Sequence, residues 1–283
     1  MISLRLESER AYNRGKMDDP KEVIELLSKT LRHKVRPIVL ANKGAVVATI
    51  KQDGTPQTPI DVEAEFIVRE ALSAHYPQLA HYGEESGYPS VLPEEYWLLD
   101  IIDGTKSFMA GVPAFTAMAV YISNNEPTAS VIYDYTNDNI FTAYKGEGAF
   151  KNGKMIRIDA VSMPKIATCR ERMVTEVNNL LISNKIPTSC VEGLNGAGYG
   201  FIQVVDGQLS ARFNFPHQPN EGHVHDYAPG ALLVQEAGGL IIPVDGSAKY
   251  SLSVKSFVAC HPKLAPFVRE NAKRIRDIEL STT

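Results

Sequence analysis

The segment Trp97–Phe108 constrains the fold of this chain more than any other part of the sequence. It begins with an apolar run that is typical of a buried strand, and Asp100 follows this run directly. A second carboxylate, Asp103, comes three residues later and precedes a glycine and a threonine. Glycine favours turns and threonine favours helix N-caps. The segment therefore predicts a strand, a sharp turn and a helix start, with two acids at the corner.

Such a corner is suited to binding metal ions and phosphate. The strand anchors the acids, the turn brings their oxygens to one side, and the helix start offers unpaired backbone N–H groups to an anion. The simpler interpretation is a solvated turn with a capped helix. Two other segments favour the first interpretation. Tyr82–Gly87 places Glu84 in a loop bounded by glycines, and His225–Gly230 brings Asp226 in front of a helical stretch.

In this order the three segments resemble the inositol monophosphatase family of magnesium-dependent, lithium-sensitive phosphomonoesterases. The resemblance covers most of the chain, from about Ala41 to Asp245. Within the family, Gly104–Phe108 followed by Gly111–Phe115 looks most like the histidinol-phosphatase branch. The Asp-Gly-Thr-Lys start is also similar to the 3′-nucleotidase branch, so the motifs do not separate the branches.

The composition agrees with an intracellular enzyme. The net charge is −4 and the sequence has no lysine or arginine block, which argues against a nucleic-acid polymer or a membrane surface as partner. Cys169, Cys190 and Cys260 are too few and too scattered for a disulfide framework, so we expect a reducing, cytoplasmic compartment. No secretory signal and no membrane-spanning segment are expected.

The 283 residues are expected to form two halves, because the pattern changes near residue 155. Residues 1–155 predict an α+β half with an antiparallel sheet. Its expected elements are a helix from Asp18 or Asp19 to about Ala41, a polar hairpin or loop at 51–58, a helix at 61–75, strands at 96–99, 116–122, 129–133 and 139–144, and a hairpin turn at Asn152-Gly153.

Residues 156–283 alternate between helices and strands, which predicts an α/β half with a mixed or parallel sheet. Its expected helices are 171–184, 196–206, 226–237 and 263–279, and its expected strands are 188–191, 210–215, 239–244 and 256–260. The resemblance implies that both halves form one layered α-β-α-β-α sandwich, with the active site where the halves meet.

The resemblance also implies a ligand set for two or three Mg²⁺ ions. Hard cations with oxygen ligands suit phosphate-ester hydrolysis, because charge develops on oxygen in the transition state. The implied ligands are Glu84, Asp100, Asp103, Asp226 and the backbone carbonyl of Ile102. Carboxylates crowded in this way repel one another without metal, which raises their pKa values. We therefore expect magnesium to stabilise the folded protein.

Water is the expected nucleophile, because no serine or cysteine has the sequence context of an activated nucleophile. In the family pattern the proton acceptor is the threonine of the corner motif, paired with an upstream aspartate. These positions are Thr105 and Asp61, which join Glu84 and Asp103 as the implied catalytic residues. Equally, Thr58 or Asp61 is expected to cap the following helix, which does not exclude catalysis.

Substrate contacts are expected from three parts of the chain. Backbone N–H groups at Gly104 and Thr105 are expected to hold the phosphate, with Lys106 either contacting an anionic substrate or lying in solvent. The small-residue turn Asn195–Gly198, which includes Gly196 and Ala197, allows a ligand to approach the backbone. Asp226 is also implied to face the ester oxygen. The family's substrate-contacting acid has no clear match, and Asn214, Asn220 and Glu221 are all candidates.

Two positions depart from the family pattern. Ile101 stands where the family usually has proline, which removes an extended-backbone restraint. His225 stands where the family usually has tryptophan, and it adds a group that titrates near neutrality. With His217 and His223 it forms a cluster that, taken alone, is compatible with a zinc or iron site. A pH-sensitive site and histidines without a site role are the alternatives.

The function expected from these residues is metal-dependent hydrolysis of a small-molecule phosphate monoester, with an inositol-1-phosphate-like substrate favoured. The alternatives are a histidinol-phosphate phosphatase and a 3′(2′),5′-bisphosphate nucleotidase. A non-catalytic regulatory protein that binds a phosphate ligand is a further alternative, although every metal carboxylate of the pattern is present. The resemblance also implies a homodimer.

Overall fold

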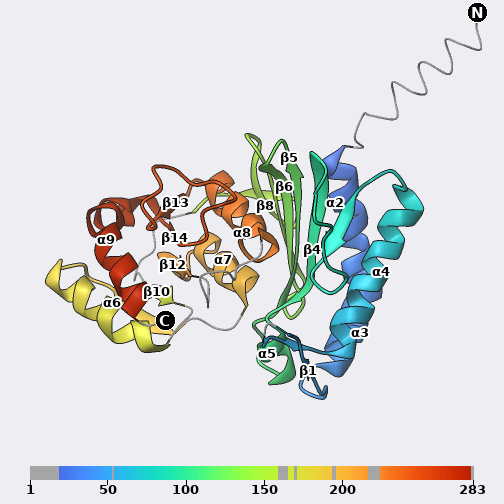
Figure 1. The fold of residues 1–283 in the computed structure, drawn as a ribbon, viewed down its shortest axis with the longest axis horizontal. Coiled ribbons are helices and arrows are strands. Elements are labelled where there is room, and N and C mark those ends of the chain that lie inside the picture. Colours follow the sequence, from blue (N-terminus) through green and yellow to red (C-terminus); the bar gives the residue numbers. More distant parts are fainter. Residues whose placement is uncertain are drawn as a thin grey trace, which may run out of the picture.

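A computed structural model describes residues 19–52, 54–158, 165–168, 171–192, 196–215 and 224–281. These residues form five layers, which Figure 1 shows side by side: helices, a seven-stranded sheet, a second helix layer, a five-stranded sheet and a third helix layer. This is the expected α-β-α-β-α sandwich. Within the described residues, no helix combines the length and the apolar character needed to cross a membrane.

The first helix layer covers the outer face of the seven-stranded sheet (Figure 1). Asp19 caps its start by accepting a hydrogen bond from the Lys21 amide (2.9 Å). The predicted helix is confirmed, with a π-helical turn in its middle: α2 (Pro20–Thr30), η1 (Leu31–Val35) and α3 (Arg36–Asn42). A small hairpin follows, formed by β1 (Thr49–Ile50) and β2 (Pro56–Gln57), and then α4 (Pro59–His75).

The seven-stranded sheet has the strand order β3-β4-β5-β6-β7-β8-β9. Its strands are β3 (His81–Gly83), β4 (Glu95–Asp103), β5 (Thr116–Ser123), β6 (Glu126–Asp134), β7 (Asn139–Tyr144), β8 (Gly148–Lys151) and β9 (Lys154–Ile156). The predicted antiparallel pairing is confirmed except at one edge, where β3 runs parallel to β4. Asn152 and Gly153 both have positive φ (50° and 76°), as the predicted hairpin turn requires.

The five-stranded sheet has the order β11-β10-β12-β14-β13 and is mixed, as expected. Its strands are β10 (Lys165–Thr168), β11 (Ser189–Glu192), β12 (Ala211–Asn214), β13 (Leu240–Pro243) and β14 (Phe257–Cys260). The helices of this part are α6 (Glu171–Ser183), α7 (Ala197–Val205), α8 (Val224–Glu236), η2 (Pro262–Leu264) and α9 (Ala265–Ser281). Sequence patterns missed β10, whereas the other four strands of this sheet lie within two residues of their predicted ranges.

The middle layer positions the candidate site. Helices α7 and α8 bury their apolar side chains between the two sheets and share one core with both. Helices α6 and α9 cover the opposite face of the five-stranded sheet. The seven-stranded sheet ends at Ile156 and the five-stranded sheet begins at Lys165. That residues 1–155 and 156–283 are separate units stays a prediction.

Candidate active site

A β-bulge near the end of β4 brings the two acids of the opening segment to one face of the sheet. In a regular strand, residues three apart point to opposite faces. Here Asp100 pairs with Met118 whereas Asp103 pairs with Thr116, so β4 has one residue more than β5 in this interval. The extra residue lets Ile101 and Ile102 both pack into the outer core, and both acids face α7 and α8.

The turn that follows differs in one detail from the prediction. Gly104, and not Thr105, is the N-cap residue of α5 (Thr105–Met109), with a left-handed backbone (φ 86°). Thr105 is the first helical residue, and its hydroxyl donates to Asp61 Oδ1 (2.9 Å) and approaches the Ile102 carbonyl oxygen (3.2 Å). The Thr105 hydroxyl therefore bonds to Asp61 on α4 and does not cap α5.

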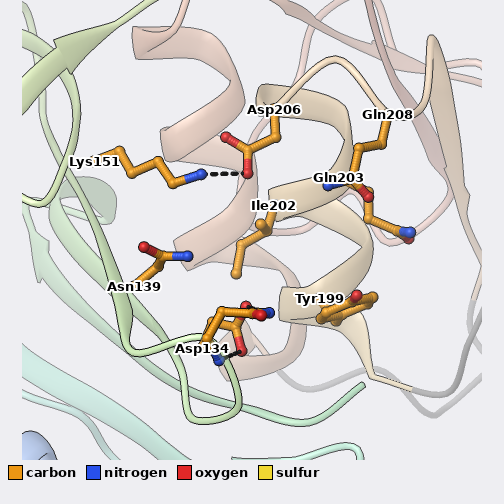
Figure 2. A pocket seen from close by; sticks show the side chains of 9 residues that line it. Asp134, Asn139, Lys151, Tyr199, Ile202, Gln203, Asp206 and Gln208 are labelled. Atoms are coloured by element: carbon orange, nitrogen blue, oxygen red, sulfur yellow. Dashed lines mark hydrogen bonds and ion pairs between the residues drawn. The ribbon is translucent and has the colours of Figure 1, made fainter. Parts of the chain in front are cut away.

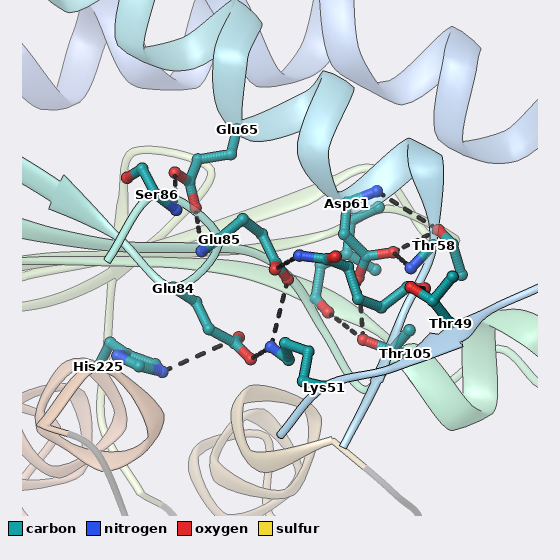
Figure 3. Close-up of polar contacts among 12 residues, drawn as sticks. Thr49, Lys51, Thr58, Asp61, Glu65, Glu84, Glu85, Ser86, Thr105 and His225 are labelled. Atoms are coloured by element: carbon teal, nitrogen blue, oxygen red, sulfur yellow. Dashed lines mark hydrogen bonds and ion pairs between the residues drawn. The ribbon is translucent and has the colours of Figure 1, made fainter. Parts of the chain in front are cut away.

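Asp61 combines a structural and a site position, as Figure 3 shows. It is the third residue of α4 and forms a capping box with Thr58, whose amide donates to Asp61 Oδ2 (3.0 Å). Thr58 is therefore the cap, as predicted. Burial raises the pKa of Asp61, and the hydrogen bonds from Thr58 and Thr105 act against this rise. A carboxylate with a raised pKa is a better proton acceptor near neutral pH.

The loop that carries Glu84 is held in place by Glu65, a buried glutamate of α4. The Glu84 amide donates to the carbonyl of Leu99 on β4 (3.0 Å). The Glu65 carboxylate accepts hydrogen bonds from the next two amides, Glu85 (2.8 Å) and Ser86 (3.0 Å), and it is 2% exposed. Figure 3 shows Glu65 reaching from α4 towards Glu85 and Ser86. Burial also raises the pKa of Glu85.

Replacing Gly83 by alanine is expected to disturb this support. A Cβ at position 83 would lie 2.1–2.2 Å from the carboxylate atoms of Glu65, so the buried carboxylate must move and release two amides. We expect a loss of about 1–3 kcal/mol in the free energy of unfolding, measured by urea denaturation.

Adding Gly83→Ala to a Glu65→Ala background gives the matched control, because the clash partner is then absent. An equal cost of Gly83→Ala in both backgrounds would show that the clash is not its cause.

Glu84, Asp100 and His225 form the centre of the cluster. One ligand atom from each lies within 4.8 Å of the others, and they come from the β3 end, β4 and α8. Burial raises the pKa of Asp100 well above its usual range, and repulsion by Glu84, Asp103, Asp226 and Asp61 raises it further. Raised carboxylate pKa values at one buried place are typical of functional sites.

Asp226 lies in the first turn of α8, with its side chain 40% exposed. Its Oδ1 is 3.1 Å from His225 Nε2, and the same nitrogen is 3.8 Å from Glu84 Oε2. Burial lowers the pKa of His225, but Asp226 and Glu84 together raise it above its ordinary value. The structure therefore brings Glu84, Asp100, Asp103 and Asp226 together, whereas their role as metal ligands stays a prediction.

Asp103 is bound by the start of α7. Its Oδ1 accepts from the Ala197 amide (2.7 Å), and its Oδ2 accepts from the Gly198 amide (2.9 Å) and from Thr116 Oγ1 (2.8 Å). Burial raises the pKa of Asp103, and these three hydrogen bonds act against the rise. Asp103 thus connects the seven-stranded sheet to the middle helix layer.

Sequence reasoning missed two residues of the site. Lys51 directly follows β1 and forms ion pairs with Glu84 and Glu85 (3.6 Å to the latter), as Figure 3 shows. Its side chain is 19% exposed. Its ammonium group therefore supplies positive charge at the carboxylates. The Tyr88 hydroxyl hydrogen bonds to His225 Nδ1, and the two rings stack. Burial and the charges of Asp100 and Glu84 raise the pKa of Tyr88, so its phenol is neutral.

The remaining predicted residues lie in different surroundings. Lys106 is exposed on α5. Gly196 precedes α7 with a positive φ (127°), and a Cβ there would lie 2.7 Å from the Ala114 carbonyl oxygen. The Asn214 amide is used within the C-terminal part, where it accepts from Arg212 (2.9 Å) and donates to the Lys255 carbonyl (3.0 Å). The following residues named from the sequence lie outside the described residues: Asp18, Cys169, Asn195, His217, Asn220, Glu221 and His223.

A cavity lies beside α7, lined mostly by polar side chains of the seven-stranded sheet and of this helix (Figure 2). Its volume is about 260 Å³, and an ion pair between Lys151 and Asp206 (2.7 Å) spans part of its wall. None of the carboxylates of the candidate site lines it.

Comparison with known proteins gives a consistent result. The sequence model of the inositol monophosphatase family matches residues 19–277. Inositol monophosphatase 1 of Solanum lycopersicum is 27% identical over 223 residues, which are 73% of this chain and 78% of that protein. Nus factor SuhB of Salmonella typhimurium (strain LT2) is 27% identical over 242 residues, which are 81% of this chain and 86% of that protein.

Solved structures show the same fold. The IMPase of Thermotoga maritima superposes with a TM-score of 0.77 at 23% identity, covering 93% of this chain and all of that chain (100%). An IMPase/NADP phosphatase solved with Mg²⁺ and phosphate superposes with a TM-score of 0.72 at 18% identity, covering 90% of this chain and 95% of that one.

Proposed function

The chain belongs to the inositol monophosphatase family and is accordingly a phosphoric monoester hydrolase, and from this premise we propose that it hydrolyses a small inositol-1-phosphate-like monoester with Mg²⁺. The single observation that carries the proposal is the convergence of Glu84, Asp100, Asp103 and Asp226 around one place, with Thr105 and Asp61 beside it. A related fold solved with Mg²⁺ and phosphate supports the choice of cation.

We propose that Glu84, Asp100, Asp103, Asp226 and the Ile102 carbonyl hold two or three ions. The donor set fits, because it consists of oxygens and its buried acids repel one another in the absence of a cation. Divalent ions held there supply a Lewis acid for the phosphate oxygens and lower the pKa of water.

The protein's own groups then orient the reactants. The hydroxyl of Thr105 donates to Asp61, so its oxygen lone pairs remain available to accept a proton from the attacking water. Asp61 receives the proton through this hydrogen bond, which its raised pKa favours. Backbone N–H groups at Gly104 and Thr105 face the phosphate, and Asp226 faces the leaving oxygen.

The first part of α7 limits the substrate by shape. The amides of Ala197 and Gly198 already donate hydrogen bonds to Asp103, so they are not available to a substrate. This segment therefore offers backbone and small side chains to a substrate. Gly196 contributes no side chain. A small polyol phosphate suits such a surface. We further propose a homodimer that lithium inhibits, which follows from the family resemblance. We also propose a cytoplasmic location, which follows from the few, scattered cysteines.

A phosphate-release assay tests the proposal. The panel contains inositol 1-phosphate, histidinol phosphate, adenosine 3′,5′-bisphosphate, fructose 1,6-bisphosphate and glycerol 2-phosphate, each with magnesium, with and without lithium. We expect the highest kcat/KM with inositol 1-phosphate, inhibition by lithium and no turnover after chelation of metal. If none of the five compounds releases phosphate at millimolar magnesium, the proposal is refuted.

A further inference from the structure

His225 lies within the acidic cluster with one ring nitrogen facing the carboxylates. The residue is 1% exposed, and its Nε2 lies 3.1 Å from Asp226 Oδ1 and 3.8 Å from Glu84 Oε2. Two ligands of one ion, each bonded at about 2.0–2.2 Å, are separated by at most about 4.4 Å. Glu84 Oε2 and His225 Nε2, which are 3.8 Å apart, already meet this limit. With one carboxylate oxygen of Asp100 added, the ligand atoms of all three residues lie within 4.8 Å of one another.

The opposite ring nitrogen is held by a partner suited to this arrangement. His225 Nδ1 hydrogen bonds to the Tyr88 hydroxyl, and the two rings stack with centroids 5.6 Å apart and an interplanar angle of 20°. When Nδ1–H donates to the phenol oxygen, the lone pair of Nε2 faces Asp226 Oδ1 (3.1 Å) and Glu84 Oε2 (3.8 Å). Histidines that bind metal are oriented in this way, by a polar partner on the nitrogen that does not bind.

The residue type changes which cations the site prefers. An all-oxygen set suits Mg²⁺, whereas imidazole nitrogen suits borderline transition ions. A tryptophan, which the family usually has at this position, offers only an N–H donor and no ligand lone pair. Histidine therefore adds a ligand where the family has none.

We propose that His225 Nε2 coordinates the cation shared by Glu84 and Asp100, which makes this one ion position bind borderline divalent transition ions, Co²⁺ or Zn²⁺, more tightly than Mg²⁺. The inference rests on the proposed function, because it concerns the same carboxylates. Lys51 is paired with Glu84 Oε1, whereas His225 lies nearer to Oε2, so the ammonium group repels a cation bound at Oε2 without occupying the same oxygen.

The test measures metal binding by the full-length, metal-free protein, without substrate. Co²⁺ and Mg²⁺ affinities are obtained by calorimetry, and Co²⁺ ligation by its visible absorption. His225→Phe retains a ring that stacks on Tyr88 and removes the ligand, and His225→Gln is a smaller polar alternative. His33→Gln is the matched control, because His33 is exposed on η1, away from the site.

We expect His225→Phe and His225→Gln to weaken Co²⁺ binding at least about tenfold, to change Mg²⁺ binding by less than about threefold, and to alter the Co²⁺ absorption. His33→Gln should match the wild type. Equal effects on both ions, or no effect on Co²⁺, would overturn the proposal. If the variants do not fold, ¹⁵N NMR of the wild-type imidazoles decides: the Nε2 resonance of His225 must shift on Zn²⁺ addition, and an unchanged resonance overturns the proposal.

These measurements separate the two proposals. A protein that binds Co²⁺ through His225 but releases no phosphate retains this inference and loses the proposed function. A magnesium-dependent phosphatase whose Co²⁺ affinity is the same in His225→Phe retains the function and loses the inference.

Discussion

Replacing Asp100 by asparagine is expected to abolish phosphate release and, at the same time, to stabilise the metal-free protein at neutral pH. Asp100 is 4% exposed, and the largest causes acting on its pKa all raise it: burial first, then Glu84, Asp103, Asp226 and Asp61. Asparagine is nearly isosteric and carries no charge. It therefore removes the repulsion together with one proposed metal ligand.

The sign of the pH dependence follows from this direction. A carboxyl whose pKa is higher in the folded than in the unfolded protein contributes stability below its ordinary pKa of about 3.9, and this contribution is lost as the pH rises through the folded-state value. Because pH 7.5 lies far above the ordinary pKa, the wild-type protein has lost at least part of this contribution there. Asp100→Asn should therefore be more stable than wild type at pH 7.5, and the advantage should shrink as the pH falls towards 4.

The size of the effect can be estimated from repulsion at about 5 Å in an effective dielectric between water and about 20, which gives roughly 1–3 kcal/mol. This corresponds to several degrees in Tm for a protein of this size, at about 2–4 °C per kcal/mol. Differential scanning calorimetry in a chelator checks it. Addition of magnesium should raise the Tm of the wild type and leave that of Asp100→Asn nearly unchanged.

Asp134→Asn is the matched control, because Asp134 is buried but accepts hydrogen bonds from the amides of Thr136 (3.0 Å) and Asn137 (3.1 Å) and from the Asn137 side chain (2.7 Å). This variant should be less stable than wild type at neutral pH. A loss of stability in Asp100→Asn as large as that in Asp134→Asn would contradict the assignment of Asp100 as a buried, repelled charge.

Much of the fold was predictable, because local patterns and tertiary packing agree along most of the chain. Asp19 and Pro20 start α2, Asn152-Gly153 forms the hairpin turn, and the apolar run before Asp100 is a buried strand, all as the residue types require. The short edge strand β3 was missed because three residues carry no periodic signal. The β-bulge was also missed, since it depends on the register against β5.

The site was predictable where a motif carries the chemistry and not where the tertiary fold supplies it. The motif residues Asp100 and Asp103 gave their own signal, and the family pattern added Asp61. Lys51 and Tyr88 reach the cluster only because a small hairpin and the loop after β3 fold onto it. A lysine in a polar loop and a tyrosine beside proline have many ordinary explanations, so no sequence pattern identified them.

Replacing Asp103 by asparagine is expected to have the opposite effect on stability from Asp100→Asn, although the two acids are three residues apart on one strand. Three donors converge on Asp103: the amides of Ala197 and Gly198 and the hydroxyl of Thr116. An asparagine side chain has only one acceptor oxygen, and its amide nitrogen cannot accept. At least one of the donors is therefore left facing another donor.

The expected cost is about 1–3 kcal/mol in the free energy of unfolding, because an unsatisfied buried donor loses its solvation without a replacement. Burial raises the pKa of Asp103, so removing the charge returns part of this cost. The lost hydrogen bond still decides the sign of the change in the free energy of unfolding. Both oxygens of a carboxyl group can accept a hydrogen bond even when one is protonated, whereas the asparagine amide nitrogen cannot. Urea denaturation in a chelator at pH 7.5, with Asp100→Asn measured alongside, checks the prediction.

Phosphate release should be lost in both variants, so activity alone does not distinguish them. Thr116→Val separates the two roles of Asp103, because it removes one donor and leaves the carboxylate. We expect Thr116→Val to lower stability without preventing the magnesium-dependent rise in Tm. If Asp103→Asn proves as stable as Asp100→Asn, the contact between β4 and α7 is not what orders the start of that helix. Asp103 would then be only another repelled charge of the cluster.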